Sequence, residues 1–99
     1  EAVVVYTMQL AARGLERRIR ANDIGPGPID TPIFPDFERM VGKQMMDAYV
    51  ARVGRLGKPD DIAEAVVMLA EGHVGWLNGQ HIIVDGGLTA TFSAGLKTG

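Results

Sequence analysis

The residues best suited to hold a ligand lie in the loop Gly25-Pro26-Gly27-Pro28, which ends a short strand that we predict at 19–24. Glycine lets a ligand approach the backbone closely, and proline stiffens the chain. Free backbone groups and the Thr31 hydroxyl could hydrogen-bond a planar amide, while Pro26 and Ile29 offer an apolar wall. A rigid connection between a strand and a helix explains the same residues, so both interpretations stay open.

A metal site is the next possibility that the residue types raise. His73 and His81 stand near Asp60, Asp61 and Glu64 in the sequence, but their spacings match no known set of metal ligands. The two aspartates are explained as first-turn acids that favour the positive end of a helix dipole. We therefore predict no metal site.

Composition excludes several classes of function. The chain has 99 residues, of which 46% are hydrophobic and 22% charged, as in a single globular domain. A formal net charge of -2 provides no basic excess for binding nucleic acid, and there is no cysteine for disulfides or thiolate chemistry. No apolar segment approaches the roughly 20 residues of a membrane span, and the first residues lack the basic start of a signal peptide. We expect a cytoplasmic protein with no nucleic-acid or membrane partner.

Apolar spacing predicts about three helices that must support the loop. The first covers 1–17, where apolar residues recur at helical intervals. The second covers about 36–51, with Asp36 as its cap. The third begins at Pro59, a favoured first helical position, and ends at Gly72. The last dozen residues show no firm period, and we predict no element there.

Two segments, 19–24 and 80–85, predict strands that end in the Gly-Pro loop and in Gly86-Gly87. Asp23 is unusual in a strand and is expected to face a partner or a turn. Helices separate the strands in sequence, which favours a parallel pair with a right-handed crossover. Two parallel strands do not form a stable sheet alone. We therefore predict the last part of a larger α/β domain.

Three motifs, in this order and at this spacing, resemble the short-chain dehydrogenase/reductase family, and the resemblance covers the chain from residue 1 to Gly87. It implies an α/β fold, the C-terminal portion of a Rossmann-like doubly wound parallel sheet, here with two strands and about three helices. The motifs are Asn22-Asp23-Ile24-Gly25-Pro26-Gly27-Pro28-Ile29-Asp30-Thr31-Pro32, Gly54-Arg55-Leu56-Gly57-Lys58-Pro59-Asp60-Asp61-Ile62-Ala63 and Asn78-Gly79-Gln80-His81-Ile82-Ile83-Val84-Asp85-Gly86-Gly87.

The resemblance implies an NAD(P)-dependent oxidoreductase that transfers a hydride between nicotinamide and a carbonyl or secondary alcohol. In such proteins the loop holds the nicotinamide, with the backbone of Ile29 and the side chain of Thr31 near its carboxamide. The cofactor-binding residues that it implies are Pro26, Gly27, Pro28, Ile29 and Thr31.

The segment at about 32–53 resembles the family's substrate lid. Ile33, Phe34 and Met40 are its candidate substrate contacts. Their apolar character suggests a bulky substrate such as a steroid or an aryl alcohol. Packing of an ordinary amphipathic helix explains each of them equally well.

The family's catalytic residues have no match in this chain. Its Tyr-x-x-x-Lys pair is missing, since neither Tyr6 nor Tyr49 is followed by Lys four residues later, and the lysine would align just before Glu1. The catalytic Asn and Ser and the Gly-rich phosphate turn would lie further upstream. We thus expect residues 1–99 to be the C-terminal segment of one Rossmann-fold domain, inactive alone, and the choice between NAD and NADP lies outside it.

The resemblance also implies a homodimer or homotetramer. Family contacts between subunits point to the triple valine at 3–5, the strand centre at 82–84 and the tail through Phe92 as candidate interfaces. Packing against the rest of the same subunit explains these residues as well. An alternative function is a non-catalytic, truncated relative that acts as an oligomerisation or interaction module.

Overall fold

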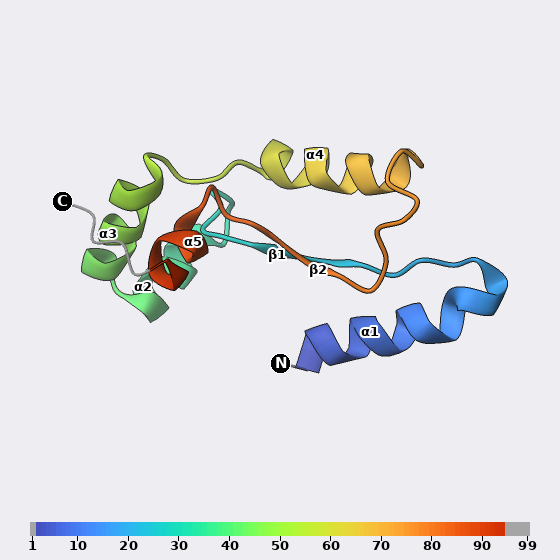
Figure 1. Cartoon of the computed structure of the whole chain (residues 1–99). Coiled ribbons are helices and arrows are strands. Elements are labelled where there is room, and N and C mark those ends of the chain that lie inside the picture. The colour runs from blue at the N-terminus through green and yellow to red at the C-terminus, as the bar shows by residue number, and fades with distance from the viewer. Residues whose placement is uncertain (1, 95–99) are drawn as a thin grey trace.

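A computed structural model of the chain describes residues 2–94, which form one two-stranded sheet, five α-helices and a short 3-10 helix. Figure 1 shows their arrangement. The elements are α1 (Ala2–Gly14), η1 (Leu15–Arg17), β1 (Asp23–Pro26), α2 (Phe34–Val41), α3 (Lys43–Val53), α4 (Pro59–Ala70), β2 (His81–Val84) and α5 (Leu88–Ser93).

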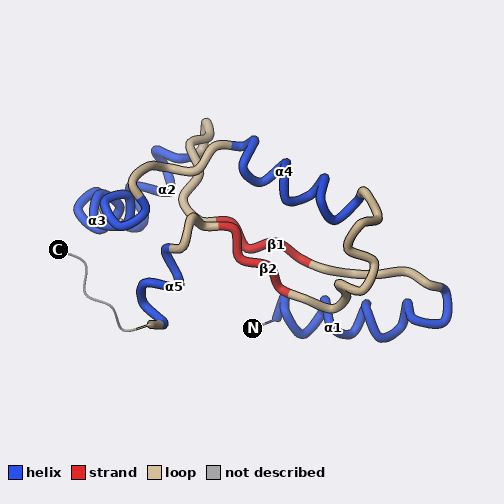
Figure 2. The backbone as a smooth tube through the Cα atoms, turned by 45° about the horizontal axis from the view of Figure 1, so that its top comes forward, coloured by secondary structure: helices blue, strands red, loops and turns tan. Residues whose placement is uncertain are grey.

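The two strands pair in parallel, as predicted, with the register running from Asp23 opposite His81 to Pro26 opposite Val84. Helices α4 and α1 lie on opposite sides of the strand pair (Figures 1 and 2). Helices α2, α3 and α5 lie together beyond the carboxyl ends of the two strands (Figure 1). The α/β fold class is therefore confirmed, and the carboxyl ends of both strands meet at one place.

The prediction of the first strand at 19–24 is wrong at both ends, because β1 begins only at Asp23 and continues through Pro26. The residues before it are held in other ways. Ile19 donates its N–H to the Gly14 carbonyl at 3.0 Å, and Ala21 donates to Oδ1 of Asn78 at 3.0 Å. These bonds take the chain out of the sheet until residue 23. The second strand agrees with the prediction apart from its terminal residues.

The prediction of one helix at 36–51 is also wrong, because α2 and α3 are separate helices. Gly42 divides them with a φ of 102°, a conformation that side chains with a Cβ disfavour. Its N–H ends α2 on the Glu38 carbonyl at 2.8 Å, and its carbonyl accepts the N–H of Met46 at 3.0 Å to begin α3.

Helix α5 is not among the predicted helices, and together with the division of 36–51 into two helices it raises the number in the described residues from about three to five. Asp85 begins it, since its carboxylate accepts the N–H of Gly87 at 3.0 Å and that of Thr89 at 2.8 Å. The other two helices match their predictions more closely. The prediction at 1–17 is met over the described residues by α1 and η1, and α4 begins at Pro59 but ends at Ala70, before Gly72.

The core of the described residues is small. Its buried apolar side chains are Ala11, Met46 and Leu88, whereas Val3 and Trp76 are 53% and 100% exposed. The radius of gyration is 15.8 Å, against about 13 Å for a compact domain of this length. The accessible surface is 7349 Å², against about 5,500 Å² for a compact monomer of the same mass. A larger domain that covers these side chains stays our prediction. Among residues 2–94, no helix has the length and apolar character to cross a membrane.

Candidate functional site

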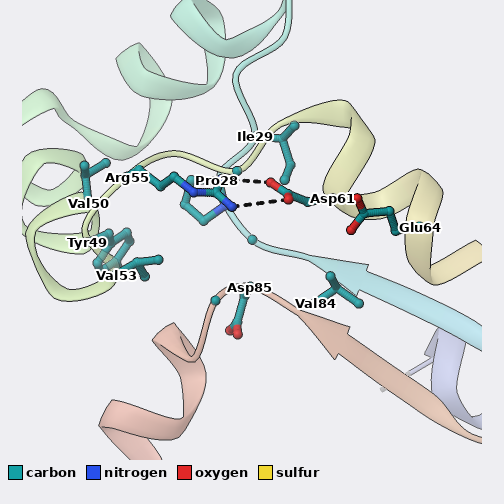
Figure 3. A pocket seen from close by; sticks show the side chains of 13 residues that line it. Pro28, Ile29, Tyr49, Val50, Val53, Arg55, Asp61, Glu64, Val84 and Asp85 are labelled. Carbon is teal, nitrogen blue, oxygen red and sulfur yellow. Dashed lines mark hydrogen bonds and ion pairs between the residues drawn. The ribbon is translucent and has the colours of Figure 1, made fainter.

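A cavity of about 410 Å³ lies where the two strands end (Figure 3). Its wall combines four parts of the chain: the loop at 27–29, one face of α3, the segment at 55–64 that begins α4, and the end of β2 at 84–86. Cavities that bind small molecules usually measure roughly 300–1,000 Å³. Ligands of open parallel sheets bind beyond the carboxyl ends of the strands, so the place and the size both fit a ligand site.

Backbone hydrogen bonds fix the loop on two sides. Gly27 donates its N–H to the Val84 carbonyl at 3.1 Å, which extends the strand pairing by one residue. Gly57 donates to the Pro28 carbonyl at 2.9 Å and accepts the N–H of Asp30 at 2.8 Å. These bonds hold the loop between β2 and the segment that leads into α4.

Two consequences follow for the shape of the loop. In the parallel bridge between Ile29 and Gly57, the bonding groups belong to residues 28 and 30, so the N–H and C=O of Ile29 point away from Gly57. At Gly27, a Cβ atom would lie 2.7 Å from Cβ of Asp85. Only glycine allows this close approach of the loop to β2.

Helix α3 supplies the apolar wall that faces the loop. Tyr49, Val50 and Val53 project from one face of α3 into the cavity (Figure 3). Val53 also lies against Gly86, just after β2. An aromatic ring and two branched side chains thus form the wall of the cavity on the α3 side.

An ion pair borders the cavity at the start of α4. Arg55 donates to both carboxylate oxygens of Asp61, at 2.8 and 3.2 Å, and the N–H of Lys58 bonds to Asp61 at 2.7 Å (Figure 3). Arg55 first, and then the Lys58 N–H, lower the pKa of Asp61 to about 2. Asp61 therefore stays ionised and caps α4, as expected for an acid in a first turn.

A second acid borders the cavity at the end of β2. Burial by itself would raise the pKa of Asp85, but the hydrogen bonds from Thr89 and Gly87 outweigh it and lower that pKa. The ionised carboxylate begins α5, and the Asp85 side chain points toward that helix (Figure 3).

The structure brings together three of the five predicted cofactor-binding residues. Gly27, Pro28 and Ile29 line the cavity, whereas Pro26 and Thr31 do not. Pro26 is the exposed last residue of β1, and the Thr31 carbonyl accepts the N–H of Phe34 at 2.9 Å at the start of α2. Their assignment to a cofactor stays a prediction.

The three predicted substrate contacts lie outside the cavity wall. Ile33 and Met40 are 71% and 78% exposed, and Phe34 is half-buried at the start of α2. The residues of α3 that do line the cavity are Tyr49, Val50 and Val53, which the sequence analysis did not identify. The sequence pattern that could have identified these three residues is the apolar spacing of one helical face after Gly42.

A polar cluster lies at the opposite end of the strand pair. Asp23 is hydrogen-bonded to Nδ1 of His81, its partner in the register, so the expectation that Asp23 faces a partner is met. The hydroxyl of Thr7, which is buried in α1, and then the His81 ring lower the pKa of Asp23. This cluster joins α1 to the sheet, away from the cavity.

Comparisons with known proteins agree on one family. The family described as "Enoyl-(Acyl carrier protein) reductase" matches residues 1–89. The chain is 34% identical to coniferyl-alcohol dehydrogenase from Pseudomonas sp. (strain HR199 / DSM 7063) over 93 residues, which are 93% of this chain and 36% of that protein. It spans between 16% and 36% of the length of the curated relatives that it resembles most.

Solved structures with the same fold include proteins bound to dinucleotides. The TT0495 protein from Thermus thermophilus superposes with a TM-score of 0.79 at 28% identity, over 90% of this chain and 37% of that one. A 4-hydroxyisoleucine dehydrogenase complexed with NADH gives 0.72 at 26% identity, over 90% and 35% of the two chains. The protein ElxO with NADP bound gives 0.69 at 25% identity, over 90% and 36%. This chain therefore belongs to the short-chain dehydrogenase/reductase family.

Proposed function

We propose that the whole protein that carries this chain is an NAD(P)-dependent oxidoreductase, which transfers a hydride between nicotinamide and a carbonyl or secondary alcohol. The observation that carries the proposal is the loop at 27–29, which lies in a cavity at the carboxyl ends of two parallel strands. Relatives that act as dehydrogenases and fold neighbours that bind NADH or NADP support it.

The residues around the loop fit a nicotinamide ring. Pro28 and Ile29 on one side and Val50 on α3 offer apolar surfaces to a flat ring. The N–H and C=O of Ile29, which the bridge to Gly57 leaves unused, match the oxygen and the amide protons of a carboxamide. Pro26 and Thr31 flank the loop and would complete the cofactor-binding set. The cofactor supplies the hydride chemistry, and this chain's residues orient the ring.

The rest of the site follows from the same proposal. Residues 1–99 form the C-terminal segment of one Rossmann-fold domain, and the catalytic Ser, Tyr and Lys lie outside the chain. The segment at about 32–53 acts as the substrate lid, with Ile33, Phe34 and Met40 exposed enough to meet a bulky apolar alcohol or ketone. The protein assembles as a homodimer or homotetramer in which α1 and the region of β2 and α5 meet a second copy.

Fluorescence titration of the full-length protein with NADH and NADPH tests the cofactor site. The Gly27→Ala variant forces a Cβ atom into Asp85 and is expected to weaken binding of the preferred dinucleotide at least about tenfold. Gly75→Ala is the matched control, because a Cβ atom at residue 75 meets nothing within 4 Å. Circular dichroism confirms that both variants fold.

The titration also separates the two candidate functions. If the wild-type protein binds neither dinucleotide and turns over no carbonyl or alcohol, the oxidoreductase proposal is wrong and the interaction module takes its place. If Gly27→Ala binds as tightly as Gly75→Ala does, the loop is not the cofactor site.

A further inference from the structure

Helices α3 and α5 are fastened together by a small group of side chains, which we call the α3–α5 latch: Tyr49, Arg52, Thr91 and Phe92. The Arg52 guanidinium lies over the Phe92 ring, 4.3 Å from its centre, and its Nη1 donates to Oγ1 of Thr91 at 3.0 Å. The Tyr49 ring meets Phe92 edge to face, with 5.9 Å between ring centres and 82° between planes. A cation over an aromatic ring and an edge-to-face pair are both attractive arrangements.

The latch holds the helix that forms the cavity wall. Tyr49 belongs both to the latch and to the wall, and Val50 and Val53 continue that wall along α3. Helix α2, the other main packing partner of α3, contributes no buried residue. By contrast α3 and α5 each contribute one of the few buried apolar side chains, Met46 at 1% and Leu88 at 8% exposure. The position of the wall therefore depends mainly on α5.

Helix α5 is in turn tied to the sheet. Three residues separate it from the end of β2, and its start is fixed by the carboxylate of Asp85, which accepts hydrogen bonds from Gly87 and Thr89. The chain of contacts runs from β2 through Asp85 to α5, and across the latch to α3. It ends at the side of the cavity that faces the loop at 27–29.

We propose that Arg52 and Phe92 are positioning residues that set how closely α3 encloses the nicotinamide ring. This inference rests on the proposed function. When the latch is broken, α3 moves away from the loop more often, and the dinucleotide loses the contacts to its nicotinamide end. A cation–π contact of the usual strength corresponds to an effect of about threefold to tenfold on binding.

The test uses the full-length protein with two variants that break the latch, Arg52→Met and Phe92→Leu. Each is expected to raise the NADH dissociation constant about threefold to tenfold and to reduce the fluorescence enhancement of bound NADH. Binding of ADP-ribose, which lacks the nicotinamide ring, should not change. Arg52→Lys keeps a cation over the ring and should restore part of the affinity. Arg39→Met removes an exposed arginine from α2, whose ion pair within residues 2–94 is with the exposed Asp36, and it serves as the matched control.

Hydrogen exchange gives a second measurement that needs no ligand. Exchange at 43–53 should rise in both latch variants, while exchange in α4 stays as in the wild type. If Phe92→Leu also loosens α4, Thr91→Val replaces it, because that variant removes only the hydroxyl contacts to Arg52 and Leu88.

The outcomes separate the latch from the proposed function. Unchanged NADH affinity and unchanged exchange of α3 in the variants overturn the latch. An equal loss of affinity for NADH and ADP-ribose also overturns it, because the effect would not be specific to the nicotinamide end. If the wild type binds neither ligand, the proposed function fails, and the exchange of α3 alone decides whether Arg52 and Phe92 hold the helix.

Discussion

The two ends of the strand pair are held in different ways. At the amino end, the side chains of Arg20, Asn22 and Asn78 bond to backbone groups 49 to 57 residues away, and these bonds are partly buried. At the carboxyl end, the ion pairs Lys43–Asp47 and Arg55–Asp61 join residues 4 and 6 apart in sequence and are exposed. The amino end holds several long-range side-chain bonds, whereas the carboxyl end combines these local ion pairs with the long-range bond from Arg52 to Thr91.

This difference agrees with the division of work in a parallel sheet, where ligands bind beyond the carboxyl ends of the strands. Ligand-binding elements are often drawn from the less stable parts of a fold, which agrees with the smaller number of long-range side-chain bonds at this end. Variants at the amino end should therefore lower the free energy of unfolding more than variants at the carboxyl end do. Four predictions test this comparison.

The largest effect is expected at Arg20. Its guanidinium donates to the carbonyls of Leu69, Val74 and Leu77 at 3.1–3.3 Å, so it joins the segment before β1 to the end of α4 and the loop after it. Arg20→Met keeps the apolar stem and removes all three bonds, and it should lower the free energy of unfolding by about 3 kcal/mol. Urea denaturation of the full-length protein measures the change. Arg17→Met, on the exposed η1, is the control, and an equal loss in both variants would contradict the prediction.

The next effect is expected at Asn22, whose side-chain amide makes two hydrogen bonds to the loop between α4 and β2. Its Nδ2 donates to the Leu77 carbonyl at 3.0 Å, and its Oδ1 accepts the N–H of Gln80 at 3.0 Å. Asn22→Ala should cost about 1.5 kcal/mol of unfolding free energy in the same assay. Asn22→Asp keeps the acceptor and loses the donor, so its loss should be smaller. A larger loss for Asp than for Ala would contradict this prediction.

The local signals of the sequence predicted much of this fold. Pro59 followed by two acids marked the start of α4, and the apolar centre at 82–84 marked the second strand. The strand bounds could not be predicted, because residues 19–22 are held by Asn78 and Gly14, which the local pattern does not show. The break at Gly42 was visible only as one glycine in an amphipathic stretch, and its φ of 102° decides the outcome.

The candidate site was also predicted only in part, because some of it follows from local motifs and some from contacts between distant residues. The loop at 27–29 is a local motif, and it lies at the cavity as its place after a strand indicates. The wall of α3 depends on α5 through Arg52 and Phe92, which are 40 residues apart, and no local pattern connects them. Helix α5 itself depends on Asp85 as a cap, a signal that the small residues after it obscured.

At the carboxyl end, Asp61 should give a stability contribution that depends on pH. The pKa of Asp61 is lowered from 3.8 to about 2 by Arg55, so the folded state favours the ionised carboxylate. This contribution is fully present above about pH 4, where the carboxyl group is ionised in the unfolded chain as well, and it is lost as the pH falls toward 2. Asp61→Asn should lower the urea midpoint at pH 7, and its difference from wild type should shrink between pH 4 and pH 2. Asp60→Asn is the control. If the difference in urea midpoint between Asp61→Asn and the wild type grew on acidification, Asp61 would not be the source of the pH dependence.

The smallest effect is expected at Lys43, which pairs with Asp47 one turn along α3. The two side chains are 75% and 61% exposed, and solvent-exposed pairs of this kind add little because water and salt screen them. Lys43→Met should leave the thermal midpoint and the NADH affinity unchanged, although it stands on the same helix as Arg52. The full-length protein measured at low and high NaCl checks this, since any residual difference should vanish at high salt. If Lys43→Met weakened NADH binding as much as Arg52→Met, then general disturbance of α3 rather than its contact with α5 would govern the cavity wall.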